Sequence, residues 1–175
     1  FTMPTPEDGT GDNAGIKSDT WEIANNDNNK FLNWKRNFAP NADMTMKNVF
    51  AQSGYTSGRI VVSAKIKVNP IDGDTTKKYF EMGTTPGHWD GIANKFQICD
   101  IKSNSFELYV TAKGNARVTV NADMVNSFCR IDFVHDFDSK KAEIYVNGEL
   151  AMDEIPLNLT NAGEVTSVNA LSLCM

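Results

Sequence analysis

Residues 128–150 read FCRIDFVHDFDSKKAEIYVNGEL, and this stretch decides the fold class. Apolar and polar residues alternate on both sides of a polar turn, and Asn147-Gly148 follows the second alternating run. Asn and Gly both tolerate the positive φ angles of a type I′ turn, so Asn-Gly between such runs is a strong hairpin signal. The stretch therefore predicts three antiparallel strands, at Ser127–Asp136, Ala142–Val146 and Glu149–Met152.

The same two-residue period appears earlier, where residues 59–68 read RIVVSAKIKV. Its apolar residues fall on one face and Arg59, Ser63, Lys65 and Lys67 fall mostly on the other, as in a sheet with one buried face. Further short β-branched and aromatic runs lie between turn residues and predict more strands. These runs are Asp19–Ala24, Lys30–Lys35, Lys78–Met82, Asn94–Ile101, Ser105–Ala112, Ala116–Val120 and Val168–Leu173.

Helix signals are almost absent, and many short strands at regular spacing predict an all-β fold, a sandwich or a barrel. The chain has 175 residues, without a linker or an internal repeat, so we expect a single domain over 1–175. One set of apolar side chains is expected to line the space between two antiparallel sheets. The set is Ile60, Val62, Ile66, Ile131, Phe133, Ile144 and Val146.

The composition weighs against several classes of protein. A formal net charge of −5 weighs against nucleic acid and anionic membranes as partners, and it slightly favours neutral over acidic glycans. No apolar run approaches the roughly 18 residues of a membrane-spanning helix, so no membrane insertion is expected. Cys99, Cys129 and Cys174 are too few for a disulfide scaffold and form no CxxC pair, so we interpret them as small buried residues.

Residues 128–150 resemble the signature hairpin of laminin-G-like and concanavalin-A-like modules. In those modules an aromatic-led strand ends in Tyr-Asp or His-Asp and turns into a strand that closes on YVNGEL or a near variant. The Trp21 strand, the asparagine-rich turn at 25–29 and residues 58–62 fit the same pattern. The resemblance implies a jelly-roll β-sandwich, attached to a secreted or cell-surface bacterial polysaccharide-degrading protein and excised from a longer chain.

Catalytic signatures are missing from the sequence. Hydrolases of this fold place two carboxylates across a sugar cleft in a Glu-x-Asp-x-x-Glu run, and no such run occurs. A lyase needs a base such as Tyr or His, and its Gln-Ile-His strand motif is also missing. Of the two histidines, His135 is interpreted as structural. We therefore predict no catalytic residue, and keep an unrecognised lyase or hydrolase as the less favoured alternative.

Aromatic residues beside polar groups in loops are the sequence feature of sugar binding, because rings stack on sugars while planar groups bond the hydroxyls. Trp89, with His88 and Asp90 as neighbours, is the first candidate, and its alternative role is to cap the end of the sandwich. Trp34 follows the asparagine-rich turn and is the second, with core packing as its alternative. Tyr55 is the third, because it lies in a Gly-bounded loop.

A structural Ca²⁺ is also expected, since jelly rolls of this kind often hold one through carboxylates and carbonyls. Asp72 and Asp74 are the predicted ligands, although Asp-Gly-Asp is equally ordinary turn chemistry. Taken together, the sequence favours a non-catalytic module that binds a polysaccharide or glycan and adjoins neighbouring domains. A structural or adhesion spacer that binds no sugar is the main alternative.

Overall fold

The computed structural model describes the backbone of residues 20–26, 29–35, 45–49, 53–68, 78–84, 95–159, 163–164 and 167–174. Side chains are described for 53–68, 82–84, 95–157 and 167–171. The chain divides into two compact units, Phe1–Met44 and Thr45–Met175. The expectation of a single domain over 1–175 stays a prediction.

The first unit contains one antiparallel hairpin. Its strands are β1 (Thr20–Asn26) and β2 (Asn29–Lys35). Trp21 lies opposite Trp34 in the register, and Asn26 lies opposite Asn29 at the turn. Both strands were predicted from the sequence, and the asparagine-rich run provides the turn between them.

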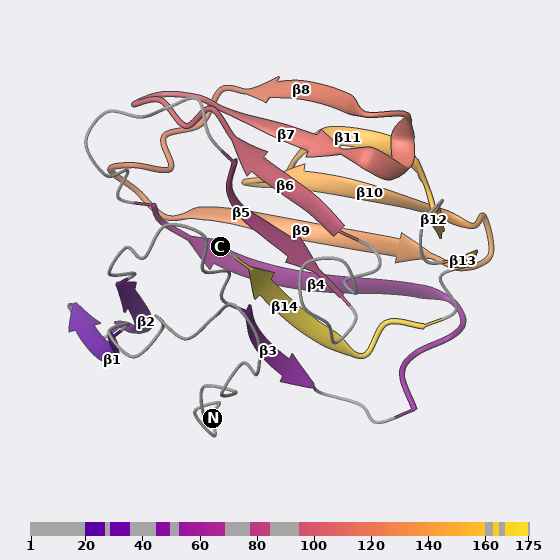
Figure 1. Ribbon diagram of the computed structural model, residues 1–175, viewed down its shortest axis with the longest axis horizontal. Coiled ribbons are helices and arrows are strands. Elements are labelled where there is room, and N and C mark those ends of the chain that lie inside the picture. The colour runs from indigo at the N-terminus through magenta and orange to yellow at the C-terminus, as the bar shows by residue number, and fades with distance from the viewer. Residues whose placement is uncertain are drawn as a thin grey trace, which may run out of the picture. The chain divides into compact units, whose positions relative to one another are not determined.

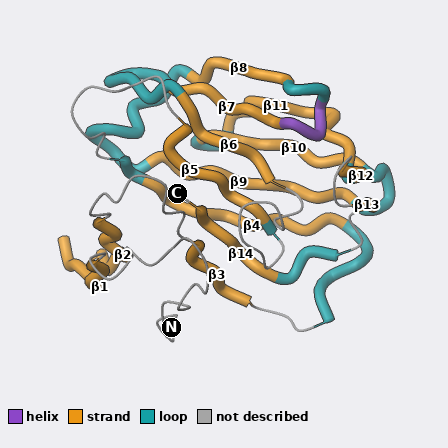
Figure 2. Tube along the Cα trace, in the orientation of Figure 1, coloured by secondary structure: helices purple, strands orange, loops and turns teal. Residues whose placement is uncertain are grey.

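The second unit contains two antiparallel sheets (Figure 1). The four-stranded sheet has the order β11-β10-β9-β4, and the six-stranded sheet has the order β3-β14-β5-β6-β7-β8. The strands are β3 (Thr45–Val49), β4 (Arg59–Ile66), β5 (Lys78–Gly83), β6 (Lys95–Cys99), β7 (Phe106–Val110), β8 (Ala116–Val120), β9 (Cys129–Asp136), β10 (Lys141–Val146), β11 (Glu149–Pro156) and β14 (Ala170–Cys174). The short strands β12 (Asn158–Leu159) and β13 (Gly163–Glu164) pair with each other. One 3-10 turn, η3 (Thr111–Lys113), lies between β7 and β8, and the rest of the described chain is strand and loop (Figure 2).

The two sheets pack face to face around one hydrophobic cluster, so the predicted all-β, two-sheet antiparallel β-sandwich is confirmed. Strand alternation directs one residue in two toward this cluster. Five of the seven predicted core residues are buried in it, and Ile60 and Ile66 are partly buried and pack against it. Phe96 on β6 meets Phe133 on β9 edge to face.

The Asn-Gly hairpin forms as predicted between β10 and β11. Asn147 and Gly148 have φ angles of 52° and 88°, and Val146 pairs with Glu149 across the turn. The Asn147 side chain also accepts a hydrogen bond from the Arg130 N–H at 2.9 Å, which ties the turn to β9. The turn residues therefore fix the register of this sheet.

Several parts of the fold were not predicted, among them β3, the end of β11 and the short pair of β12 and β13. β3 reads TMKNV, with too few β-branched residues to stand out, and it forms because β14 pairs with it along one edge. β11 continues past the predicted end at Met152 through a bulge, at which Ala142 pairs with Ile155 but Ile144 pairs with Met152. The bulge interrupts the two-residue period, so the sequence pattern ends before the strand does.

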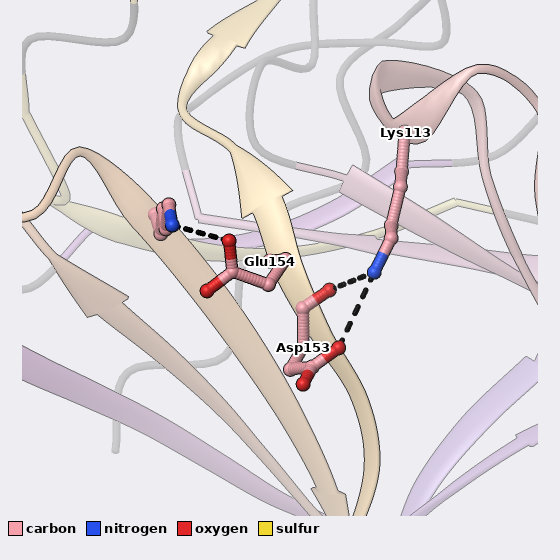
Figure 3. A network of polar contacts seen from close by, with 4 residues as sticks. Lys113, Asp153 and Glu154 are labelled. Carbon is pink, nitrogen blue, oxygen red and sulfur yellow. Dashed lines mark hydrogen bonds and ion pairs between the residues drawn. The ribbon is translucent and has the colours of Figure 1, made fainter.

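Lysine side chains bind the two acidic residues of this bulge (Figure 3). Lys113, from η3, contacts the Asp153 carboxylate at 3.3 Å and also donates to its carbonyl, while Lys141 bonds to Glu154. Glu154 has a φ angle of 51°, which is unusual for a residue with a side chain. Because η3 belongs to the connection between β7 and β8, the Lys113 contact joins the two sheets at β11.

Candidate functional site

An open groove of about 500 Å³ lies beside β4. Strand β4 is the last strand of its sheet, and β9 is its one ladder partner among the described residues. The groove has the size of a small-ligand site, which is typically about 300–1,000 Å³. Its described lining is Tyr55, Arg59, Ile60, Val61, Val62, Ser63 and Leu171.

Tyr55 is held at this groove by its backbone. Its N–H donates to the Val168 carbonyl at 2.8 Å and its carbonyl accepts from the Val168 N–H at 2.9 Å. The preceding Gly54 has a φ angle of 70°, and a Cβ there would lie 2.7 Å from the Ser167 Cβ, so only glycine fits. The Tyr55 side chain remains half exposed in the groove. The sequence made Tyr55 a sugar-binding candidate because it is an aromatic residue in a loop. Its role as a ligand-binding residue stays a prediction.

Arg59 lies on the outward face of β4 and forms an ion pair. Its Nη2 donates to Glu143 Oε2 on β10 at 2.5 Å, and the Tyr145 hydroxyl donates to the same oxygen at 2.9 Å. The Arg59 side chain is still 55% exposed. A guanidinium has five N–H donors, so this pairing leaves Arg59 able to bind a further acceptor.

Ser63 is the second polar residue of the groove, and its hydroxyl is fixed by a carboxylate. It donates to Asp132 Oδ1 at 2.5 Å, and Arg130 Nε donates to the same atom at 2.8 Å. Burial alone would raise the pKa of the Asp132 carboxyl, but the bonds from Ser63 and Arg130 outweigh it and hold the pKa below its usual value. A hydroxyl that donates to a carboxylate presents its lone pairs outward, so Ser63 can accept a hydrogen bond from a ligand.

The outward face of the six-stranded sheet offers another tyrosine, but its ring is already covered. The Arg117 guanidinium lies 4.6 Å from the centre of the Tyr109 ring, and the Tyr109 hydroxyl donates to Asn115 at 2.7 Å. Arg117 also bonds to Glu107 at 3.0 Å. This ring face is therefore occupied by a cation, and Tyr109 is not among the described residues that line the groove.

Two carboxylates come close together beside Arg117. The pKa of Asp100 is raised by its burial and by the neighbouring Glu107 carboxylate, with Arg117 acting in the opposite direction. Arg117 lies 4.0 Å from Asp100 and 3.0 Å from Glu107. The described lining of the groove contains neither residue, so this acidic pair forms part of a network separate from the candidate site.

Several predicted site residues lie outside the described side chains. Trp89, His88 and Asp90 fall in residues that the structure does not describe, and so do the proposed calcium ligands Asp72 and Asp74. Trp34 is described only as a backbone position in β2. Among the described residues no group of three or more His, Cys, Asp or Glu side chains is arranged to hold a metal ion. The calcium site therefore stays a prediction.

His135 is fully buried, in agreement with the structural role expected of it. Its Nε2 lies 3.0 Å from the Thr84 hydroxyl, and its ring packs at 4.3 Å from the Phe133 ring. Burial lowers the pKa of His135 to about 4. Cys99 and Cys129 are also buried, as interpreted from the sequence. In the part of the chain that the structure describes, no helix is long and apolar enough to cross a membrane.

Sequence reasoning did not select Arg59 and Ser63 as ligand-binding candidates. Their alternation placed them on the polar face of a strand, next to the Tyr55 loop. That pattern does not reveal whether the strand lies at the edge of its sheet or in the centre. The edge position of β4, which opens the groove, follows from long-range pairing.

No family model matches the chain, and no curated protein matches it. A sialidase superposes with a TM-score of 0.45 and 10% identity, over 78% of this chain and 12% of the sialidase chain. A variant of human galectin-16 gives a TM-score of 0.41 and 10% identity, over 74% of this chain and 84% of that one. The laminarinase catalytic domain from Thermotoga maritima gives 0.39 and 14%, over 89% of this chain and 62% of that one.

Proposed function

We propose that this chain is a non-catalytic carbohydrate-binding module and that the groove beside β4 is part of its binding site. The observation behind the proposal is that the half-exposed Tyr55 ring borders the same groove as Arg59 and Ser63. Sugars are recognised by stacking their CH faces on aromatic rings and by bonding their hydroxyls to planar polar groups. The groove contains both kinds of group that this recognition requires, because Tyr55 provides an aromatic ring and Arg59 provides a planar polar group.

The apolar part of the groove lining suits the same ligand. Ile60 and Leu171 are partly buried and pack against the core, so they present apolar surface on a rigid support. A pyranose ring has both CH faces and hydroxyl edges, and a wall that is apolar on one side and polar on the other matches it. The sequence resemblance to concanavalin-A-like modules supports the same function.

The proposal extends to residues outside the groove. Trp89, with His88 and Asp90, and Trp34 are proposed as further sugar-binding residues, and Asp72 and Asp74 as ligands of a structural Ca²⁺. We also propose that the chain acts outside the cell, beside other domains of a polysaccharide-processing protein. These parts rest on the sequence alone.

The test is a glycan array probed with the wild-type protein, Tyr55→Ala and Trp89→Ala, with calcium and with a chelator. Loss of one stacking ring is expected to weaken binding about threefold to tenfold, on the order of 1 kcal/mol. Phe128→Ala is the matched control, because Phe128 is a similarly exposed aromatic that does not line the groove.

The outcomes separate the alternatives. If Tyr55→Ala binds as the wild type does while Trp89→Ala does not, the groove is not the site. If the array is silent with folded wild-type protein, the sugar-binding function is wrong and a structural spacer becomes the better account. Release of shortened glycan by the wild-type protein would instead indicate an enzyme.

A further inference from the structure

We propose that the groove beside β4 selects anionic polysaccharides, and that Arg59 binds their carboxylate or sulfate groups. This inference rests on the proposed function and adds the class of glycan. The net charge of −5 had slightly favoured neutral glycans. The local arrangement of charges around the groove points the other way.

The described lining of the groove contains one cation, Arg59, and no carboxylate. The wider segment 53–68 carries Arg59, Lys65 and Lys67 without any Asp or Glu. Charges separated by more than about 8 Å are largely screened at physiological salt, so distant carboxylates contribute little at the groove. The charges that act at the groove are therefore Arg59 and its close neighbours, rather than the net charge of the whole chain.

The positive charges also extend along the strand. Arg59 and Lys65 have the same parity on β4, so both project from its outward face, and both are exposed. Six residues of strand place them about 20 Å apart. Arg130 lies opposite Lys65 in the register, but its guanidinium is paired with Asp132 at 2.8 Å, so the positive charge at that end comes from Lys65. A polymer that follows the edge of β4 would meet cationic groups at both ends.

Two acidic residues lie next to Arg59, and neither is among the described residues that line the groove. Asp136 is opposite Arg59 in the register, but its Oδ1 accepts from the Asp138 and Ser139 N–H groups at 3.0 and 3.1 Å. Glu143 pairs with Arg59 through a single Nη2 contact and is partly exposed. A guanidinium fork binds planar carboxylates and sulfates well, so an incoming anion competes with Glu143 for Arg59.

Matched polysaccharide pairs test the inference. Affinity is measured for polygalacturonic acid against its fully methyl-esterified form, and for dextran sulfate against dextran. The esters and the unsulfated dextran remove the charge and keep the sugar backbone. Tighter binding of the charged member of a pair is expected, and it should weaken as salt is raised. The two pairs distinguish carboxylate from sulfate as the recognised group.

Variants then locate the effect. Arg59→Gln should weaken binding of the charged polymer about tenfold or more, since a charge-assisted bond is lost, and Arg59→Lys should retain part of it. Arg117→Gln is the matched control, because it also removes one exposed arginine that pairs with a glutamate. Glu143→Gln should strengthen binding about twofold to fivefold, since the competing carboxylate is gone. Melting temperatures show that each variant is folded.

Different outcomes would contradict the charge selection and the proposed function. Equal affinity for both members of each pair overturns the charge selection and leaves sugar binding intact. Charge-dependent binding that Arg117→Gln reduces as much as Arg59→Gln does also overturns it, because the effect would then be one of net charge. If none of the polysaccharides binds, the proposed function itself is contradicted.

Discussion

Phe96 and Phe133 meet edge to face across the interior of the sandwich, with ring centroids 5.1 Å apart and an interplanar angle of 89°. Phe96 belongs to the six-stranded sheet and Phe133 to the four-stranded sheet, and both are almost fully buried. Edge-to-face contact is a favoured geometry for two rings, because the positive edge of one meets the negative face of the other. This pair therefore contributes directly to the packing of the two sheets.

Replacing Phe133 by Ala should cost about 3–5 kcal/mol of unfolding free energy, since it removes a buried ring and leaves a cavity between the sheets. Urea denaturation followed by tryptophan fluorescence measures the loss. Phe128→Ala is the matched control, because Phe128 is 46% exposed and should cost far less. Similar losses for the two variants would mean that the ring pair does not hold the sheets together.

Stability should fall between pH 6.5 and about 4 because His135 is buried in its neutral form. Its pKa is about 4 in the folded chain and about 6.5 when unfolded, so the unfolded chain takes up the proton first as the pH falls. The stability is complete above pH 6.5, and a loss of about 3 kcal/mol accumulates by pH 4. Chemical denaturation at a series of pH values measures this slope.

His135→Gln should flatten the slope across that window, whatever its effect on stability at neutral pH. The control is His88→Gln, since His88 is the second of the two histidines in the chain. If the slope persists in His135→Gln and disappears in His88→Gln, then His88 rather than His135 is the source of the acid sensitivity. Carboxylates such as Asp132 lose their contribution at lower pH and do not obscure the comparison.

Alanine substitutions at Gly148 and Gly54 distinguish the stability lost to backbone strain from the stability lost to steric contact. Gly148 has a φ angle of 88° and open space where a Cβ would stand, so Gly148→Ala should cost about 1 kcal/mol from strain alone. Gly54→Ala adds a Cβ at 2.7 Å from Ser167 and should cost clearly more. It should also displace Tyr55 and weaken glycan binding, whereas Gly148→Ala should leave binding unchanged. Equal stability losses would contradict the close approach at Gly54.

The sequence predicted the parts of this fold that depend on local patterns. The Asn147-Gly148 turn, the alternation in β4 and the core residues of β9 and β10 all follow from side-chain period and turn chemistry. β3 was missed because its pairing with β14 joins residues far apart in the chain, and the end of β11 was missed because a bulge breaks the period.

The candidate site was only partly predictable, because it also depends on pairing between residues far apart in the chain. Tyr55 was selected as a loop aromatic, but the groove beside it exists because β4 is the edge strand of its sheet. The Arg59–Glu143 ion pair joins residues 84 positions apart, and no local motif encodes it. Sequence patterns identify which residues point outward, and the topology then determines which of them meet.

The Asp132 carboxylate should stabilise the fold more than an exposed acid with a similar partner. Its side chain is 12% exposed, and it accepts bonds from Ser63 and Arg130, whereas Asp153 is 56% exposed and pairs with Lys113. Asp132→Ala should cost about 1–3 kcal/mol and Asp153→Ala at most about 1 kcal/mol. Because the folded pKa of Asp132 lies below its usual 3.8, its contribution is present above that pH and disappears as the pH falls through the folded pKa. Denaturation at neutral pH and near pH 2 checks both points. If the stability difference between wild type and Asp132→Ala persists in full at the lower pH, packing rather than charge is the source of the stability.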